Sequence, residues 1–475
     1  GVPSSEGFTK VAASTAANGT DEEIAVGRGA NLIQVSPFTG ARSADLNLPY
    51  VLRVREISGT PAPSCPAYTH PYTGTPGVMP DLTALGPDLQ TVFLVNRQRL
   101  GDLYPADQVD TVMARLQTLA ADPSVHGVVI PVDAANGTNG LPDVAGAYAA
   151  WDGAQCDPGL ANLVSDRIGM LVDGIVAGTL PGVVPHPYVF NVVLVGSDTV
   201  VPMARISDTT RIGNENSYEG FAKNTAIGGA LSTGHFLSDA PYGDVDPLPW
   251  NNRNLYLEDR AVGRLVENPT EIIGTIDQYL ASGGILSPSS ALVAGYDWMK
   301  TGATKVADEL GSSLSTANGA TVTPTRLIND TWSAATLLGS SGIGGAHPRV
   351  TSLFMHADHT QGFSATSTQA TPDAFTPQGL ADALPVGPQL VFSMGCHSGL
   401  NEQDTASRTM VDFPEAMAGV KGAVYVAATG YGLGNESGAE LHDGLMTSFA
   451  NQLDGAVSIG DALWLAKQEI GRAHV

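Results

Sequence analysis

Short apolar runs alternate with amphipathic stretches along most of the chain. The apolar run Val92–Val95 precedes a segment near Ala106–Ala120 whose apolar residues recur at helical spacing, and the run Val125–Val132 follows. A strand, a helix and a strand in this order predict a parallel βαβ unit. A helix near Leu160–Ala177 and a strand at Val189–Val195 continue the pattern.

The same alternation returns in the C-terminal half. The predicted strands are Ala291–Ala294, Thr321–Leu327, Val350–Met355, Leu390–Phe392 and Ala423–Ala427, and the predicted helices are Thr301–Leu310, Ser333–Leu338, Glu440–Leu453 and Ile459–Ile470. We therefore expect an α/β fold with mostly parallel sheets, in two successive halves.

Changes in composition divide the chain into three parts. Residues 1–87 are rich in Gly, Pro, Ser and Thr, with one strand pattern at Tyr50–Ile57, and predict a β-rich segment followed by a linker. We expect a first α/β subdomain at 88–285 and a catalytic α/β subdomain at 286–475. The first contains a loop-rich insertion at 207–260, which is either functional or a surface excursion.

Charge limits the partners of this 475-residue chain. With 23 basic and 47 acidic residues its net charge is −24, which would repel nucleic acid and anionic membranes. Clustered carboxylates are possible ligands for a structural Ca²⁺ ion. No apolar run is long enough for a transmembrane helix. The chain begins without Met or a signal peptide, so we expect a piece of a longer protein.

Three cysteines fit one disulfide and one free thiol. If Cys65 pairs with Cys156, Cys396 remains free. The alternative is three unpaired cysteines in a reducing cytosol.

Cys396 and His359 are the residues most suited to chemistry. Cys396 follows the apolar run that starts at Gln389, and His359 follows the run Val350–Met355. A thiolate attacks carbonyl carbons, and a nearby imidazole protonates the departing amine. His356 is the rival of His359, but strand alternation places it within the sheet. The open backbone beside Cys396 suits donors to an oxyanion.

These motifs resemble those of caspase-like cysteine peptidases, in which apolar blocks end in His-Gly and in Ala-Cys or Gly-Cys. Asp358-His359 and Cys396-His397-Ser398-Gly399 are similar to the legumain version. The best fit is the gingipain family, whose further landmarks are matched in order by Val193-Leu194-Val195-Gly196, Val201-Pro202, Val262-Gly263-Arg264-Leu265 and a closing helix from Ser458 to Lys467.

The resemblance implies a caspase-like α/β/α sandwich in two subdomains. It also implies that Cys396 is the nucleophile, that His359 is the general acid/base and that Asp297 orients the imidazole; the alternative for Asp297 is a loop cap. The oxyanion hole would use the amides of Cys396 and of Thr360, which stands where the family has Gly. A β-branched residue there restricts the backbone.

The substrate pocket implied by the same resemblance contains Trp298, Met299, Lys300, Tyr431 and His397. Lys300 would suit an acidic P1 side chain and Met299 an apolar one, whereas a basic P1 residue has no evident partner.

We therefore expect a secreted or cell-surface cysteine endopeptidase that acts on protein or peptide substrates through a Cys396 thioester. The alternatives are a cell-surface transpeptidase of the same fold and an inactive peptide-binding scaffold. The sequence lacks the motifs of serine hydrolases, phosphate-binding loops and zinc peptidases, and its scattered histidines show no metal-binding spacing. No cofactor is expected to be required.

Overall fold

The computed structural model describes residues 65, 67–70, 74–210, 212–222, 224–250, 253–404, 410–419, 422–438 and 440–474. Most of the segment 1–87, including the strand expected at Tyr50–Ile57, lies outside these residues. Residues 63–247 and 256–475 form one compact unit, which contains both large sheets. Residues 248–255 belong to a second unit, of which the structure describes the antiparallel strands β6 (Leu248–Trp250) and β7 (Arg253–Leu255). The boundaries expected at 88 and 286 stay predictions.

The first sheet has four parallel strands in the order β2-β1-β3-β8. They are β1 (Thr91–Val95), β2 (Gly127–Pro131), β3 (Asn191–Val195) and β8 (Ala261–Leu265). Every residue of β1, the strand between β2 and β3, is buried. A strand covered on both faces needs a continuous apolar run, which is the pattern found in the sequence.

Helices cover both faces of this sheet. They are α1 (Arg97–Leu103), α2 (Ala106–Ala120), α3 (Val144–Asp152), α4 (Pro158–Ala177) and α6 (Pro269–Ser282). Helix α2 packs against α6, and α3 packs against α4. Pro269 begins α6, and Asn268 and Glu271 form a capping box at its start.

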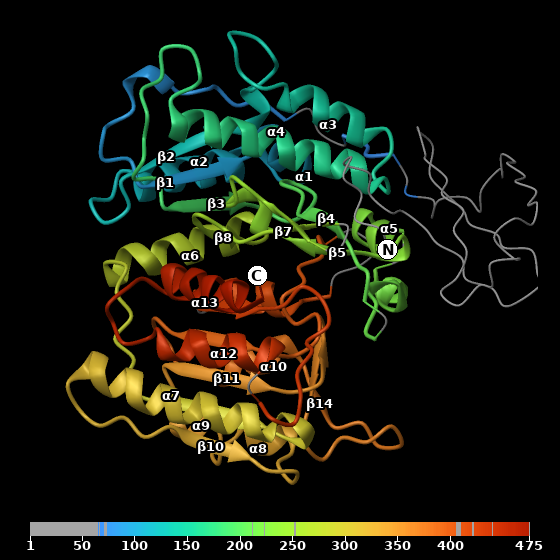
Figure 1. Cartoon of the computed structure of the whole chain (residues 1–475), viewed down its shortest axis with the longest axis vertical. Coiled ribbons are helices and arrows are strands. Elements are labelled where there is room, and N and C mark those ends of the chain that lie inside the picture. The colour runs from blue at the N-terminus through green and yellow to red at the C-terminus, as the bar shows by residue number, and fades with distance from the viewer. Residues whose placement is uncertain are drawn as a thin grey trace, which may run out of the picture. The chain divides into compact units, whose positions relative to one another are not determined.

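The second sheet has five parallel strands in the order β10-β9-β11-β15-β16. They are β9 (Ala291–Gly295), β10 (Thr325–Ile328), β11 (Val350–Phe354), β15 (Leu390–Ser393) and β16 (Val424–Ala427). Strands β10 and β11 are labelled in Figure 1. The central three strands, β9, β11 and β15, are buried throughout. The α/β class with parallel sheets is therefore confirmed.

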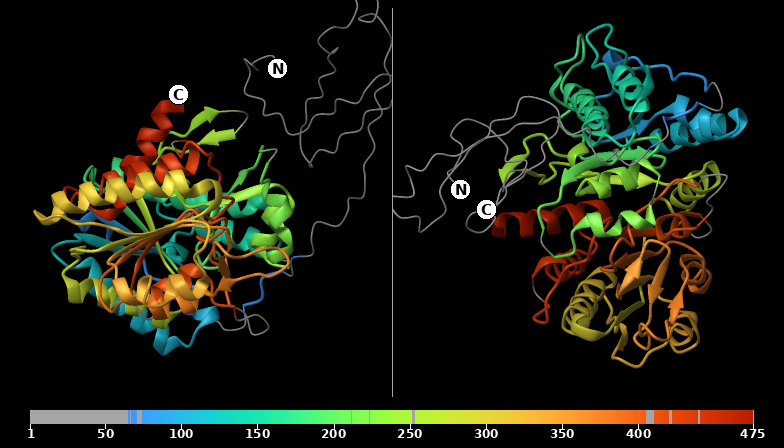
Figure 2. Two further views of the ribbon diagram at one scale, coloured as in Figure 1. Left: turned by 90° about the horizontal axis from the view of Figure 1, so that it is seen from below. Right: turned by 90° about the vertical axis from the view of Figure 1, so that its right-hand side faces the viewer.

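Figure 2 shows helices on both sides of the strands. Around the second sheet these are α7 (Lys300–Asn318), α8 (Ala334–Leu338), α9 (Ile343–Ala346), α10 (Pro377–Ala383), α11 (Phe413–Gly419), α12 (Leu441–Asn451) and α13 (Ile459–His474). Helix α7 packs against α12, and α12 against α13. Helix α11 packs against α6 of the first half, and α13 against β8, so the two halves are joined through these contacts. No helix in the described part is both long and apolar enough to cross a membrane.

The insertion between β3 and β8 is built from short elements. Within the larger unit it forms β4 (Ala204–Ser207), the 3-10 helix η4 (Glu215–Phe221), α5 (Ala226–Ser232), β5 (His235–Ser238) and the 3-10 helix η5 (Ala240–Tyr242). Short strands also follow β11, namely β12 (Ala357–Asp358), β13 (Gln361–Phe363) and β14 (Ala374–Phe375). A small apolar cluster of the insertion includes Met203, Tyr218 and Leu237, together with Leu400 from the loop after β15.

Candidate active site

Cys396 lies just beyond the end of strand β15. Its thiol is free and partly exposed, and it donates a weak hydrogen bond to the Gly432 carbonyl over 3.9 Å. Burial is the main cause that raises the pKa of the Cys396 thiol above its ordinary value. The expected disulfide between Cys65 and Cys156 is present, which leaves Cys396 as the free cysteine.

Strands β9 and β11 end at the same edge of the sheet as β15. Strand β11 pairs with β15 on one side and with β9 on the other, all in parallel. Asp297 follows β9 after one residue, and His356 follows β11 after one residue. Because parallel strands bring their carboxyl ends to one edge of a sheet, the three side chains belong to the same edge.

His356 and Asp297 contact each other at this edge. His356 Nε2 lies 3.5 Å from Asp297 Oδ2, and both side chains are about half exposed. Asp297 has a φ of 56°, a left-handed conformation that is uncommon outside glycine. Its backbone N–H donates to Asp330 Oδ1 over 2.8 Å, which supports the bend. The expectation that His356 lies within the sheet is wrong, because β11 ends at Phe354.

Tyr296 connects this pair to the loop that contains Cys396. Its hydroxyl accepts the backbone N–H of His356 over 3.1 Å, and its ring centroid lies 5.6 Å from that of His356. Burial raises the pKa of Tyr296 to about 12, and Cys396 is among the smaller electrostatic causes, so the thiol is close by. A Cβ atom placed on Gly395 would lie 2.8 Å from the Ala357 side chain. The backbone beside Cys396 therefore packs against the residue that follows His356.

His359 lies in a different, buried environment. Its side chain is 3% exposed, and its Nδ1 is 2.6 Å from the Tyr218 hydroxyl. The backbone N–H of His359 donates to the same hydroxyl, and Nε2 lies 3.6 Å from Glu402. The ring is therefore already occupied by Tyr218 and Glu402.

Thr360 is also engaged locally. Its backbone N–H donates to Asp358 Oδ1 over 2.8 Å, and its hydroxyl donates to the same oxygen. Asp358 Oδ1 also accepts the amide of Gln361 and so caps the turn between β12 and β13. An oxyanion would have to displace Asp358 to use the Thr360 amide.

Tyr218 and Glu215, on η4, hold His397, the neighbour of Cys396. The rings of Tyr218 and His397 are stacked with centroids 3.4 Å apart, and His397 Nε2 lies 2.7 Å from Glu215 Oε2. Glu215 also accepts the amide of Tyr431, whose hydroxyl bonds to Ser217. His397 is fully buried, so it supports the loop and does not line an open pocket.

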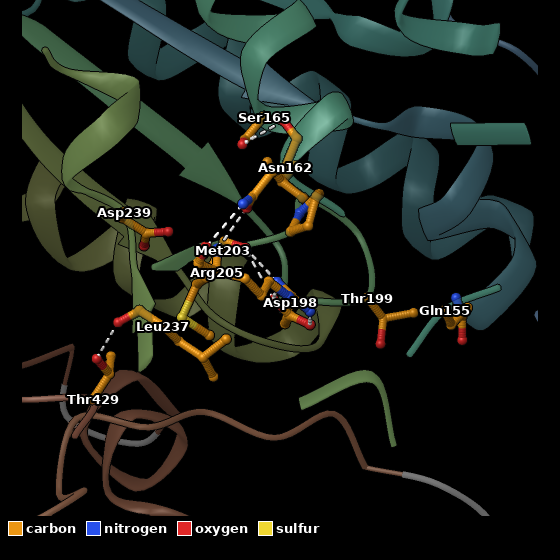
Figure 3. Close-up of polar contacts among 12 residues, drawn as sticks. Gln155, Asn162, Ser165, Asp198, Thr199, Met203, Arg205, Leu237, Asp239 and Thr429 are labelled. Carbon is orange, nitrogen blue, oxygen red and sulfur yellow. Dashed lines mark hydrogen bonds and ion pairs between the residues drawn. The ribbon is translucent and has the colours of Figure 1, made fainter. Parts of the chain in front are cut away.

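A second contact joins the insertion to the loop after β16. The Thr429 hydroxyl donates to the Leu237 carbonyl of β5 over 2.6 Å (Figure 3). On the paired strand β4, Arg205 forms an ion pair with Asp198 and bonds through its backbone to Asn162. These contacts attach the insertion to both halves.

A cavity of about 690 Å³ opens beside His356. It is lined by Tyr296, Asp297, Trp298, Lys300, Thr301, Asp330, His356, Ala365, Ser367 and Glu436. Trp298 and Lys300 are thus at the expected place, whereas Met299 is 2% exposed and packs in the core. Lys300 Nζ forms an ion pair with Asp330. Two further carboxylates, those of Asp297 and Glu436, line the cavity and do not pair with Lys300.

Sequence comparison gives no guide to the site: no protein-family model matches the chain, and no curated protein matches it significantly. The geometry therefore stands on its own. Our sequence prediction overlooked Glu215, Tyr218 and Tyr296. One signal pointed to His356, because the apolar run from Val350 to Met355 leads into it directly.

Proposed function

We propose that this protein is a cysteine peptidase with a caspase-like fold of gingipain type. One observation carries the proposal: three adjacent parallel strands, β9, β11 and β15, lead to Asp297, His356 and Cys396 at one edge of the sheet. A thiol, an imidazole and a carboxylate in this relation suit acyl transfer.

In the proposed reaction, the imidazole of His356 removes the Cys396 proton as the sulfur attacks the peptide carbonyl carbon. The new C–S bond gives a tetrahedral oxyanion, towards which the Cys396 amide donates. His356 then protonates the leaving amine as the C–N bond breaks, which leaves a thioester. Water, deprotonated by His356, hydrolyses the thioester and restores the thiol. Asp297 orients the imidazole through the contact between its Oδ2 and His356 Nε2.

His356 replaces His359 in this proposal because of their surroundings. His356 is half exposed at the cavity and contacts Asp297, whereas His359 is buried against Tyr218. A general acid/base must reach the substrate, and of these two histidines only His356 is exposed enough to do so. We infer that His359 instead stabilises the loop around Cys396.

The charge of the cavity favours a basic P1 side chain. The ion pair with Asp330 compensates Lys300, so the acidic P1 preference expected from Lys300 loses its basis. With Asp330 paired to Lys300 and Asp297 beside His356, the carboxylate of Glu436 is the one left to face a basic substrate side chain. Trp298 adds an aromatic face to which Arg or Lys binds well.

A secreted or cell-surface location is part of the same proposal. It is supported by the Cys65–Cys156 disulfide, because disulfides persist mainly in oxidising compartments.

An irreversible peptidyl chloromethyl ketone with Arg at P1 tests the function. We expect mass spectrometry to find Cys396 alkylated in folded protein, faster as pH rises because the raised pKa of the thiol limits the thiolate at neutral pH. We also expect the matching peptide amide to be hydrolysed. Denatured protein controls for intrinsic thiol reactivity.

Three outcomes separate the alternatives. Hydrolysis with no ligation to added amines supports the peptidase. Preferential ligation to an amine would identify a transpeptidase, and absence of labelling in folded protein would identify a peptide-binding scaffold.

A further inference from the structure

His397, the residue after the proposed nucleophile, has an unusual backbone conformation. Its φ is 54°, in the left-handed region that residues other than glycine seldom adopt. Its backbone N–H donates to the Gly430 carbonyl over 2.8 Å, and its carbonyl accepts the amide of Leu400 over 2.9 Å. Such a conformation persists only where the surrounding structure holds it.

Two residues of η4 hold the side chain of His397. Its Nε2 lies 2.7 Å from Glu215 Oε2, and because a carboxylate only accepts hydrogen bonds, Nε2 is the donor. Tyr218 stacks on the imidazole, and Tyr431 meets the ring edge-on with centroids 4.5 Å apart. His397 is fully buried, so loss of Glu215 would leave Nε2 without a partner in the interior.

Glu215 also binds the loop that follows β16. Its Oε1 accepts the backbone N–H of Tyr431 over 2.8 Å. Gly430 has no room for a side chain beside the same oxygen. The residue after Tyr431, Gly432, accepts the thiol of Cys396. One carboxylate therefore joins the residue after the nucleophile to the loop that the thiol contacts.

Glu215 has firm support of its own. Its backbone N–H donates to Asp208 Oδ2 over 2.8 Å, and helix α5 packs against η4. A Cβ atom on Gly229 of α5 would lie 2.5 Å from Cys156 Sγ, so this helix packs directly against the Cys65–Cys156 disulfide. A side chain held by packed elements can in turn hold another in a fixed position.

We propose that Glu215 is a positioning residue for Cys396. It holds His397 in the left-handed conformation and so orients the loop from which the Cys396 amide donates to the oxyanion. The two neighbouring amides are already used, since that of Gly395 donates to Ser393 Oγ and that of His397 to the loop after β16. This catalytic role rests on the proposed peptidase function, whereas the effect of Glu215 on the loop does not.

The kinetics of Glu215→Gln test this role. A glutamine side chain can accept one of the two hydrogen bonds but not both, because its NH₂ group only donates. We expect kcat for an Arg-P1 peptide amide to fall by about 10–10²-fold, as for a small misplacement at a reacting centre. KM should stay unchanged, because Glu215 does not line the cavity.

Glu219→Gln is the matched control, since Glu219 is exposed on the same 3-10 helix. It should change neither constant. A rise in KM with kcat unchanged, or equal effects of the two substitutions, would overturn the positioning role.

A double-mutant cycle tests whether Glu215 acts through His397. Glycine adopts a positive φ without strain, so His397→Gly removes the need to hold this backbone. In that background Glu215→Gln should lower kcat by less than about three-fold. Losses that multiply, as for independent residues, would overturn the proposal. If His397→Gly fails to fold, His397→Asn serves instead, because asparagine also tolerates the left-handed region.

Alkylation of Cys396 by iodoacetamide, measured below the unfolding temperature of each variant, gives a readout that does not need peptidase activity. The charge of Glu215 adds to the burial that raises the pKa of the Cys396 thiol. Glu215→Gln should therefore shift the pH dependence of the alkylation rate towards lower pH, whereas Glu219→Gln should leave it unchanged.

This readout separates the two proposals. An unchanged alkylation profile in Glu215→Gln would overturn the inference even if the parent protein hydrolyses peptides. A parent protein that hydrolyses no peptide, but whose Glu215→Gln variant shows the shifted profile, would contradict the peptidase proposal alone and leave Glu215 as the residue that holds the Cys396 loop.

Discussion

The two parallel sheets are built alike, but their carboxyl edges differ. Beyond β3 of the first sheet, Asp198 is 2% exposed and forms a two-bond ion pair with Arg205. Arg264 of β8 donates to the carbonyls of Gly196 and Val201 and pairs with Asp239. At the same edge of the second sheet, Asp297 and His356 remain half exposed beside a cavity.

This difference between the two carboxyl edges indicates which of them can take part in catalysis. Polar residues that follow a parallel strand often bind ligands. Gly196-Ser197-Asp198, after β3, fits this rule as well as Asp297 and His356 do after β9 and β11. In the first sheet, however, internal arginines neutralise the carboxylates. At the edge of the second sheet, by contrast, Asp297 and His356 stay accessible to a substrate.

Replacing His356 and His359 one at a time tests the catalytic role of the second edge most directly. We expect His356→Ala to lower kcat/KM for an Arg-P1 peptide by about 10²–10⁴-fold, because it deletes the general acid/base. His359→Ala should lower the unfolding temperature but keep kcat within about ten-fold, since His359 supports the fold. The reverse ranking would restore His359 to the catalytic role.

Asp198→Asn tests the first edge. It leaves the buried Arg205 without its counter-ion, which should cost about 3–5 kcal/mol of unfolding free energy in a denaturant titration. Asp308→Asn is the control, because Asp308 pairs with Arg326 at an exposed position and should cost less than about 1 kcal/mol. Equal losses in the two variants would mean that the first edge is not an internal ion-pair site.

The smallest expected effect concerns substrate preference. Asp330→Asn removes a cavity carboxylate and releases Lys300, so the preference for Arg over Ala at P1 should fall by about ten-fold in kcat/KM. Ser367→Ala alters the same cavity without a charge change and should preserve the preference. A preference for Glu at P1 in the parent protein would contradict the charge argument.

The sequence predicts the fold well where elements are long and buried. The apolar runs of β1, β9, β11 and β15 were identified because helices cover both faces of these strands. The expected strand Thr321–Leu327 is instead β10, Thr325–Ile328, at the edge of its sheet. The short helices α9, α10 and α11 were not predicted, because a few turns give little periodicity.

The candidate site was predictable only in part. Asp297 and Cys396 follow buried strands, a local signal. Which histidine can act as general acid/base depends on where β11 ends. The alternation of the sequence placed His356 inside the strand, whereas β11 ends at Phe354, before His356. Glu215 and Tyr218 lie about 180 residues from Cys396. Their role arises from tertiary contacts, for which the sequence has no local pattern.

The stacking of Tyr218 on His397 bears on whether the second half of the chain can function as a separate domain. Asp297, His356 and Cys396 all come from the second half, which would suggest an autonomous catalytic module. Yet the residue next to the nucleophile is held by Glu215 and Tyr218 from the insertion of the first half. Cutting the chain between its halves would therefore leave a buried histidine without its aromatic and acidic partners, so the second half is not expected to keep its catalytic loop in place when it is expressed alone.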